Sequence, residues 1–519
     1  MQLPAASNQT LTARPVTQRS LWLDRFSGTI ALSVLAVALV AVRTLLHLGS
    51  HFWLDETESI WMAQGGLAEL PHRIPVLPMS IPYAWLMIAI HALGARAEWI
   101  YRVPSVLAVA AASSILFRIL LRLWGKEAAW LGTAVFVSVP EISWAARNAR
   151  PYAIGVLLVI VSLWFLSRLL ERPSLVSVIG CGVAAGLVVH FQLLFAGAIL
   201  AQALYAGMVW LRGRRIHGGF LLAAGVIASA IAALAIPFVG LLASGASSRA
   251  YTALPSPDEV LTSLFAPPTG LCLLAFFIWL VFKPAAEFDA PEHDAVVFGL
   301  MATLVPVACA AAISWITKNS VWVSRYYMSY AIGLAFCFGA LAGGLRPRNA
   351  ARWIAVSLAL MQLAFFSRGF HNTKDVGDWA AGVAFVDRNT AGDHAPVLIR
   401  SQYMEGNIYP VNPVRGNGMF TQLACYPSHS RLIGLATTFG PQQARNMDEL
   451  LRGPLAGAPR FLLLASAGPS PLAPYTWYLS GRLGPGAAVR ELANFDGLTV
   501  LEFRPGAARN ETGPSGGKP

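Results

Sequence analysis

The chain has 519 residues, of which 56% are hydrophobic and only 12% are charged. Soluble domains carry about 25% charged residues, so this composition excludes an ordinary soluble protein and indicates one that is surrounded by lipid. The formal net charge is +12, but the Lys and Arg residues form short clusters between apolar runs, which argues against a nucleic-acid-binding protein.

Residues 1–27 carry three Arg residues and precede an apolar run at 28–48. This run is long enough to cross a bilayer, and it is longer than the apolar core of a cleaved signal peptide. We therefore predict a cytoplasmic N-terminal segment followed by an uncleaved first membrane helix.

Eleven further apolar runs follow before the composition changes after residue 367. They lie at 79–94, 103–124, 126–144, 151–170, 175–192, 193–211, 219–242, 266–283, 296–317, 325–345 and 350–367. The run at 79–94 is short and contains Pro82, so we predict that it lies at the membrane surface, within a first outer loop at 49–102. Eleven crossings then place most Arg and Lys clusters on the cytoplasmic side, as the positive-inside rule requires, and leave the C-terminal part outside. Twelve crossings would return it to the cytoplasm.

The predicted fold is an all-α polytopic membrane bundle of about 11–12 helices at 28–367, followed by a small α/β domain at 368–506. Residues 375–388 have the apolar spacing of a helix. Four short apolar runs are typical of buried strands. These runs lie at 396–400, 431–436, 460–466 and 498–503. The tail, 507–519, has the composition of a disordered segment.

Sequence motifs for metals and nucleotides are absent. Four of the five Cys residues lie in apolar runs, and they form neither a CxxC motif nor a disulfide framework. No Walker loop, GxSxG motif or dinucleotide fingerprint lies at a strand-to-helix junction. No cofactor is therefore predicted with certainty, and a divalent cation stays a possible one.

The first outer loop opens with an acidic motif, HFWLDETESIW, which contains Asp55, Glu56 and Glu58. A carboxylate at the boundary of water and lipid has a raised pKa when it is partly buried, and it can then serve as a general base. The alternative is a solvated acidic loop or the start of a helix, where Asp and Glu are favoured in any case.

Three Arg residues adjoin the outer ends of predicted helices, against the positive-inside rule: Arg147, Arg150 and Arg325. A guanidinium matches a phosphate in charge and geometry, so these residues could bind a lipid phosphate. They could equally reach lipid headgroups, as Arg residues at helix ends often do. Arg102 directly precedes the apolar run 103–124, and His190 lies near the outer end of the run 175–192. Each could bind a substrate or hydrogen-bond to a neighbouring helix.

Taken in order, a set of short motifs resembles the GT-C superfamily of integral membrane glycosyltransferases. The nearer match is the bacterial branch related to protein mannosyltransferases and aminoarabinose transferases. The motifs are LDE at 54–56, LPMSIPYAW at 77–85, Arg102–Ser105, Ala146–Tyr152, His190, Arg325–Tyr327 and Asp378–Trp379. The element at 77–85 keeps only part of the family's Pro-Pro-Leu-Tyr pattern, which leaves the acceptor and any metal site near it open.

The resemblance implies transfer of a sugar from a polyprenyl phosphate to an acceptor hydroxyl, with inversion, on the outer face of a bacterial plasma membrane. Asp55 matches the family's general base, and Glu56 would assist it or bind a cation. The substrate-binding residues that the resemblance and the charges suggest are Arg102, Arg147, Arg150, Tyr152, His190, Arg325 and Tyr326. The acceptor could be a lipid, a polysaccharide or a protein.

Two other functions are compatible with the sequence. A transporter or lipid flippase would also combine many helices with intramembrane charges, but it more often contains paired repeats, which are not apparent here. A family member that has lost catalysis and serves as a scaffold is the third alternative, and the intact LDE motif argues against it.

Overall fold

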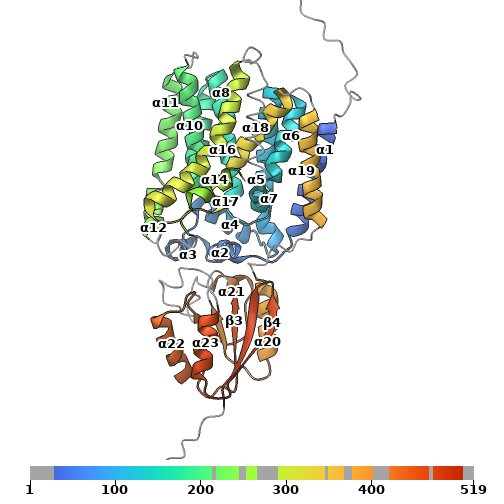
Figure 1. Cartoon of the computed structure of the whole chain (residues 1–519). Coiled ribbons are helices and arrows are strands. Elements are labelled where there is room, and N and C mark those ends of the chain that lie inside the picture. The colour runs from blue at the N-terminus through green and yellow to red at the C-terminus, as the bar shows by residue number, and fades with distance from the viewer. Residues whose placement is uncertain are drawn as a thin grey trace, which may run out of the picture.

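The structure is a computed structural model that describes residues 28–212, 218–244, 253–265, 290–344, 349–367, 377–400, 420–466 and 472–506. The predicted N-terminal segment 1–27, the apolar run 266–283 and the tail 507–519 lie outside these ranges. The described residues form a helical bundle and a smaller α/β domain that lies against one end of it (Figure 1).

Apolar helices pack side by side in the bundle, and most of them have 15 residues or more (Figure 1). They are α1 (Gly28–His47), α5 (Glu98–Trp124), α6 (Lys126–Ser138), α8 (Tyr152–Glu171), α9 (Leu175–Phe191), α10 (Ala196–Leu211), α11 (Gly218–Ala233), α12 (Ile236–Ser244), α16 (Ala290–Thr317), α18 (Tyr330–Gly344) and α19 (Asn349–Ser367). Shorter helices connect them: α2 (Leu54–Gln64), α3 (Gly66–Arg73), α4 (Ile81–Ala92), α7 (Pro140–Ala146), η1 (Leu193–Phe195), α14 (Pro257–Phe265) and α17 (Ser324–Tyr327).

Among the described residues, five helices are long and apolar enough to cross a membrane, and the bent pair α11 and α12 makes a sixth if it counts as one span. These two helices meet at 52°, with Pro237 in the first turn of α12. Four more helices are apolar but shorter than 18 residues. The chain is thus an integral membrane protein, and the predicted helical bundle is confirmed.

From the start of α1 to the end of α19, with both helices counted, the chain crosses the bundle an odd number of times. A Cβ atom on Gly28, at the start of α1, would meet Arg352 near the start of α19, so both helices begin at the same end of the bundle. Both then run toward the end that carries the α/β domain (Figure 1). An odd number agrees with eleven crossings and not with twelve.

Helix α4, in the predicted run 79–94, is too short to cross a bilayer. Its 12 residues span about 18 Å, whereas the hydrocarbon core is about 30 Å thick. The helix packs on α2 and α3 at the end of the bundle that faces the α/β domain (Figure 1).

The C-terminal domain has a five-stranded sheet between two layers of helices. Its strands are β1 (Val397–Arg400), β2 (Leu432–Leu435), β3 (Phe461–Ser466), β4 (Ala488–Phe495) and β5 (Leu498–Arg504), in the order β2-β1-β3-β5-β4. The first three are mutually parallel, and β5 and β4 are antiparallel additions. The helices are α20 (Trp379–Thr390), α21 (Gln422–Cys425), α22 (Pro441–Arg452) and α23 (Ala473–Arg482).

Alternate strand residues face the two helix layers, as the pleat of a strand requires. Val397 and Ile399 belong to a core that includes Trp379 of α20, whereas Leu398 packs with Met447 of α22 and Leu479 of α23. Asp378 caps α20 by accepting a hydrogen bond from the amide of Ala381 at 2.9 Å, so the Asp-Trp pair of the sequence caps and anchors this helix. The four predicted strands and the predicted helix are confirmed.

Candidate functional site

Helix α2, which carries the three acidic residues of the motif, lies at the end of the bundle beside the α/β domain (Figure 1). The helix begins at Leu54, and its first turn contains Asp55 and Glu56. Acidic residues there stabilise a helix by interacting with its unpaired amides, and Glu56 accepts a hydrogen bond from the amide of Trp53 at 3.3 Å. Because successive helical residues point about 100° apart, the carboxylates reach different partners.

Glu56 is fully buried and forms a bidentate ion pair with Arg102 of α5. Nε of Arg102 lies 2.7 Å from Oε1, and Nη2 lies 2.6 Å from Oε2. Oε1 also accepts a hydrogen bond from the amide of Ala149 at 2.7 Å. Glu56 therefore ties α2 to α5 and to the segment that carries Arg147 and Arg150.

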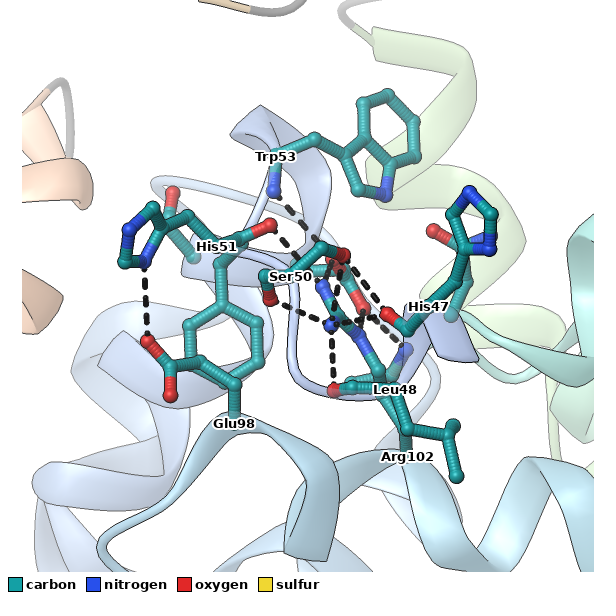
Figure 2. A network of polar contacts seen from close by, with 12 residues as sticks. His47, Leu48, Ser50, His51, Trp53, Glu98 and Arg102 are labelled. Carbon is teal, nitrogen blue, oxygen red and sulfur yellow. Dashed lines mark hydrogen bonds and ion pairs between the residues drawn. The ribbon is translucent and has the colours of Figure 1, made fainter. Parts of the chain in front are cut away.

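The remaining donors of Arg102 close the turn between α1 and α2 (Figure 2). Nη1 donates to the carbonyl groups of Leu48 at 2.9 Å and Ser50 at 2.6 Å, and Nη2 donates to that of His51 at 3.1 Å. Each nitrogen of this guanidinium thus donates to the protein itself. In the structure Arg102, predicted to bind substrate, shapes the loop on which the acidic motif stands.

Arg150 also contacts the first two turns of α2. Its Nη1 lies 2.7 Å from Oε2 of Glu58 and donates to the carbonyl group of Asp55 at 2.8 Å. Burial works against the charge of Arg150, but the carboxylates of Glu58 and Asp55 outweigh it and raise the pKa of the guanidinium above its ordinary value. Arg150 therefore fixes the backbone at Asp55 as well as the side chain of Glu58.

Asp55 is the most accessible carboxylate of the motif. Its side chain is 18% exposed, compared with 0% for Glu56 and 7% for Glu58. Oδ2 of Asp55 lies 3.6 Å from Nη2 of Arg325, whose side chain is 20% exposed. The structure thus brings together two predicted site residues that are far apart in the sequence.

Aromatic rings surround the Asp55–Arg325 pair. The guanidinium of Arg325 lies 5.7 Å from the ring of Trp53 and 5.3 Å from that of Tyr326. The ring of Trp144 lies between those of Trp53 and Tyr152, with centroid distances of 5.5 Å and 5.4 Å. The rings of Tyr152 and Tyr326 are 6.5 Å apart. The family resemblance suggested Tyr152 and Tyr326, whereas Trp53 and Trp144 were missed, although each lies within three residues of a predicted motif.

Arg147 differs from the other arginines of the site. In the part of the chain that the structure describes, its partly buried guanidinium has neither a hydrogen-bond partner nor an ion-pair partner. Burial, together with the charges of Arg43 and Arg102, lowers the pKa of Arg147 to about 10. The site therefore holds a positive charge that no carboxylate of the described chain neutralises directly.

His190 makes helix-to-helix contacts. Its Nε2 lies 2.8 Å from the carbonyl oxygen of Ile231 in α11, and its own carbonyl group accepts a hydrogen bond from Ser80 at 2.7 Å. Among the described contacts, none joins it to Asp55. This is the arrangement expected from the alternative in which His190 bonds to a neighbouring helix.

The donor set of the acidic motif does not fit a divalent cation. Each carboxylate faces a guanidinium: Asp55 faces Arg325, Glu56 faces Arg102 and Glu58 faces Arg150. Among the described residues, no group of three or more His, Cys, Asp and Glu side chains could hold a metal ion.

Comparisons with known proteins agree with this geometry. Residues 78–237, which contain Arg102, Arg147 and Arg150, match the family described as dolichyl-phosphate-mannose-protein mannosyltransferase. ArnT from Cupriavidus metallidurans in the apo state is similar over 92% of this chain and 98% of its own, with 14% identity and a TM-score of 0.53. The same protein bound to undecaprenyl phosphate is similar over 91% of this chain and 98% of its own, with 13% identity and a TM-score of 0.51.

A comparison with curated proteins finds no match. The solved structures show that the chain has the ArnT-like fold, and the matched family covers the segment that carries five of the predicted site residues. The family that matches residues 78–237 and the ArnT-like fold thereby confirm the predicted resemblance to the GT-C glycosyltransferases.

Proposed function

We propose that the protein transfers a sugar from a polyprenyl phosphate to an acceptor hydroxyl, with Asp55 as general base. The acceptor oxygen attacks the anomeric carbon while Asp55 takes its proton, and the bond from that carbon to the phosphate oxygen breaks. The lipid phosphate leaves with the bonding electrons, so the anomeric configuration inverts. The observation that carries this proposal is the greater exposure of Asp55 beside two buried, paired carboxylates.

Arg147 and Arg325 would bind the lipid phosphate. Arg147 has no anionic partner among the described residues, and the negatively charged phosphodiester of the donor would offset the cost of burying its charge. A phosphate at Arg325 would also compete with Asp55 for the guanidinium and release the carboxylate to act as a base. Both guanidinium groups would then stabilise the negative charge that grows on the leaving phosphate.

The aromatic rings of Trp53, Trp144, Tyr152 and Tyr326 would form the walls around the sugar. Flat aromatic faces pack against the apolar C–H faces of a sugar ring, and their desolvated surroundings strengthen the electrostatic interactions at the reacting atoms. Arg102, Glu56, Arg150 and Glu58 are positioning residues in this proposal, since their charged groups are engaged with one another and with the backbone.

The choice of a lipid donor is supported by the ArnT-like fold, because one structure with this fold holds undecaprenyl phosphate. The odd number of crossings and the positive-inside rule support an active site and a C-terminal domain on the outer face of a bacterial plasma membrane. The acceptor would be a lipid, a polysaccharide or a protein that is reached from that side.

The test is a transfer assay with the purified protein in lipid nanodiscs, a panel of radiolabelled polyprenyl-phosphate sugars and a cell-envelope extract as acceptor. Asp55→Asn is compared with Asp258→Asn, a matched change in the exposed helix α14. We expect label to move into the acceptor with the wild-type protein and with Asp258→Asn, but not with Asp55→Asn. Label that crosses vesicle membranes without transfer to any acceptor would instead identify a lipid transporter.

A further inference from the structure

The C-terminal domain contains a buried arginine, Arg400, that has no carboxylate partner among the described residues. Arg400 is the last residue of β1 and is only 2% exposed. Its Nε donates to the carbonyl group of Thr437 at 2.7 Å, and its Nη1 donates to that of Ser466 at 2.9 Å. Within the described residues Nη2 has no hydrogen-bond partner, and no acidic group lies within ion-pair distance of Arg400.

Three other arginines of the chain differ from Arg400 in this respect. Arg102 and Arg150 pair with glutamates, and Arg460, in the same domain, pairs with Asp393 at 2.6 Å and with Glu502 at 3.0 Å. Burying a charge without a counter-charge is costly, and burial lowers the pKa of the Arg400 guanidinium from its ordinary value. An anion at this position would remove that cost.

The position of Arg400 in the sheet is one where α/β proteins bind ligands. β1 is the middle strand of the parallel set β2-β1-β3, and the carboxyl ends of parallel strands meet at one edge of a sheet. Ligands of open α/β sheets bind outside that edge. The two carbonyl contacts fix the guanidinium there, because Ser466 is the last residue of β3 and Thr437 closely follows β2.

This edge of the sheet faces the membrane bundle. Ser466 pairs with Leu498, and a Cβ atom on Gly377 would lie 2.9 Å from the Leu498 side chain. The next residue, Asp378, lies 4.0 Å from His51 in the loop between α1 and α2. The guanidinium of Arg400 is therefore on the side of the domain that lies toward the acidic motif.

We propose that Arg400 forms an oxyanion-binding site of the C-terminal domain, for a phosphate or carboxylate group carried by the acceptor or by a lipid headgroup. The site is separate from the phosphate site at Arg147 and Arg325. The assignment to the acceptor rests on the proposed function, whereas binding of the oxyanion itself does not. Arg400 is thus a candidate for how this domain recognises a negatively charged molecule at the membrane surface.

The test measures local hydrogen exchange in the full-length protein in phosphatidylcholine nanodiscs, with inorganic phosphate or with chloride at equal ionic strength. Phosphate is expected to slow exchange in the peptides that contain Thr437 and Ser466. Arg400→Gln should weaken this effect by about 10- to 100-fold in phosphate concentration, since a hydrogen bond to a charged group is lost. Arg400→Lys keeps the charge and should retain part of the effect, even if Arg400→Gln loosens the sheet.

Arg460→Gln is the matched control, because Arg460 directly precedes β3 at the opposite edge of the sheet and has its own carboxylates. It should keep the response to phosphate, and so should Arg147→Gln, which removes the proposed donor site. Equal protection in Arg400→Gln and wild type, or no protection of the wild-type peptides, would overturn the proposal.

Two further measurements identify the molecule that carries the oxyanion. In the first, phosphatidylglycerol replaces phosphatidylcholine in the nanodiscs. Slower exchange of the same peptides, which Arg400→Gln abolishes, identifies a lipid headgroup as the source. A raised KM for the acceptor with an unchanged KM for the donor in Arg400→Gln identifies an acceptor group. Failure of the transfer assay would leave the exchange result standing, so the two proposals fail separately.

Discussion

The carboxylate of Asp55 lies 3.6 Å from the guanidinium of Arg325, and both side chains keep about a fifth of their surface exposed. Its neighbour Glu56 has no exposed surface and is held 2.6 Å from Arg102. Two adjacent acidic residues thus have different environments, one open to a ligand and one closed. This difference is the basis for assigning the chemistry to Asp55 and the support of the loop to Glu56.

Glu56→Gln is expected to destabilise the protein far more than Asp55→Asn. Breaking a buried ion pair leaves an uncompensated charge on Arg102 and costs about 3–5 kcal/mol. The Asp55–Arg325 pair is longer, at 3.6 Å, and both side chains keep contact with solvent, so its loss should cost less, about 1 kcal/mol. Thermal unfolding of both variants in nanodiscs measures the difference, and equal unfolding temperatures would show that Glu56 is not the structural residue.

Arg147→Gln is expected to stabilise the protein without donor while weakening its affinity for polyprenyl phosphate. Burial, with Arg43 and Arg102 nearby, lowers the pKa of Arg147 to about 10, so its charge costs free energy in the folded state. The cost is fully present below pH of about 10 and is relieved only as the pH rises above the lowered pKa. The gain should be about 0.5–2 kcal/mol at neutral pH.

The measurement is thermal unfolding of wild type and Arg147→Gln with and without polyprenyl phosphate. Added lipid phosphate should raise the unfolding temperature of the wild type more than that of the variant. Arg118→Gln, at an exposed position near the C-terminal end of α5, is the control. A variant that is less stable than wild type and still binds the lipid normally would contradict the role of Arg147.

Arg325→Ala is expected to weaken donor binding by about 10- to 100-fold, because a charge-assisted hydrogen bond to phosphate is lost. Arg325→Lys keeps the charge but loses the planar fork, so its affinity should lie between those of wild type and Arg325→Ala. Equilibrium binding of a fluorescent polyprenyl phosphate checks the order. Equal affinity of all three proteins would remove Arg325 from the donor site.

Tyr426→Phe is expected to loosen the C-terminal domain from the first outer loop. The Tyr426 hydroxyl oxygen accepts a hydrogen bond from the amide of Phe52 at 2.7 Å, and an amide left unpaired at this contact costs about 1–3 kcal/mol. Hydrogen exchange should rise in the peptide 48–60. Tyr478→Phe, in α23 of the same domain, is the control and should leave that peptide unchanged.

Local patterns predicted much of this fold. Apolar runs of membrane length and runs of four to seven apolar residues gave the bundle and four strands, because burial in lipid or in a sheet demands such composition. Strand β4 was missed, since its first four residues are exposed and carry no alternating apolar pattern. The amphipathic helix α22 was also missed, because its polar residues outnumber its apolar ones.

The site was predicted in its composition but not in its pairing. Asp55 and Glu56 are neighbours in the sequence, which does not tell their roles apart. Only the packing of α5 against the α1–α2 turn shows that Arg102 forms an ion pair with Glu56 and not with Asp55. Ion pairs between residues distant in the chain depend on how helices pack, which local periodicity does not encode. For the same reason, Trp53 and Trp144 became recognisable as site residues only when their rings were seen beside Arg325 and Tyr152.

The most direct test of Asp55 as general base is single-turnover transfer by Asp55→Asn, with donor affinity measured on the same sample. The account predicts that transfer falls by about 10²–10⁴-fold while the dissociation constant for the donor stays within about threefold of the wild-type value. Transfer at the wild-type rate with donor fully bound would contradict it, and the base would then have to be sought elsewhere in the site.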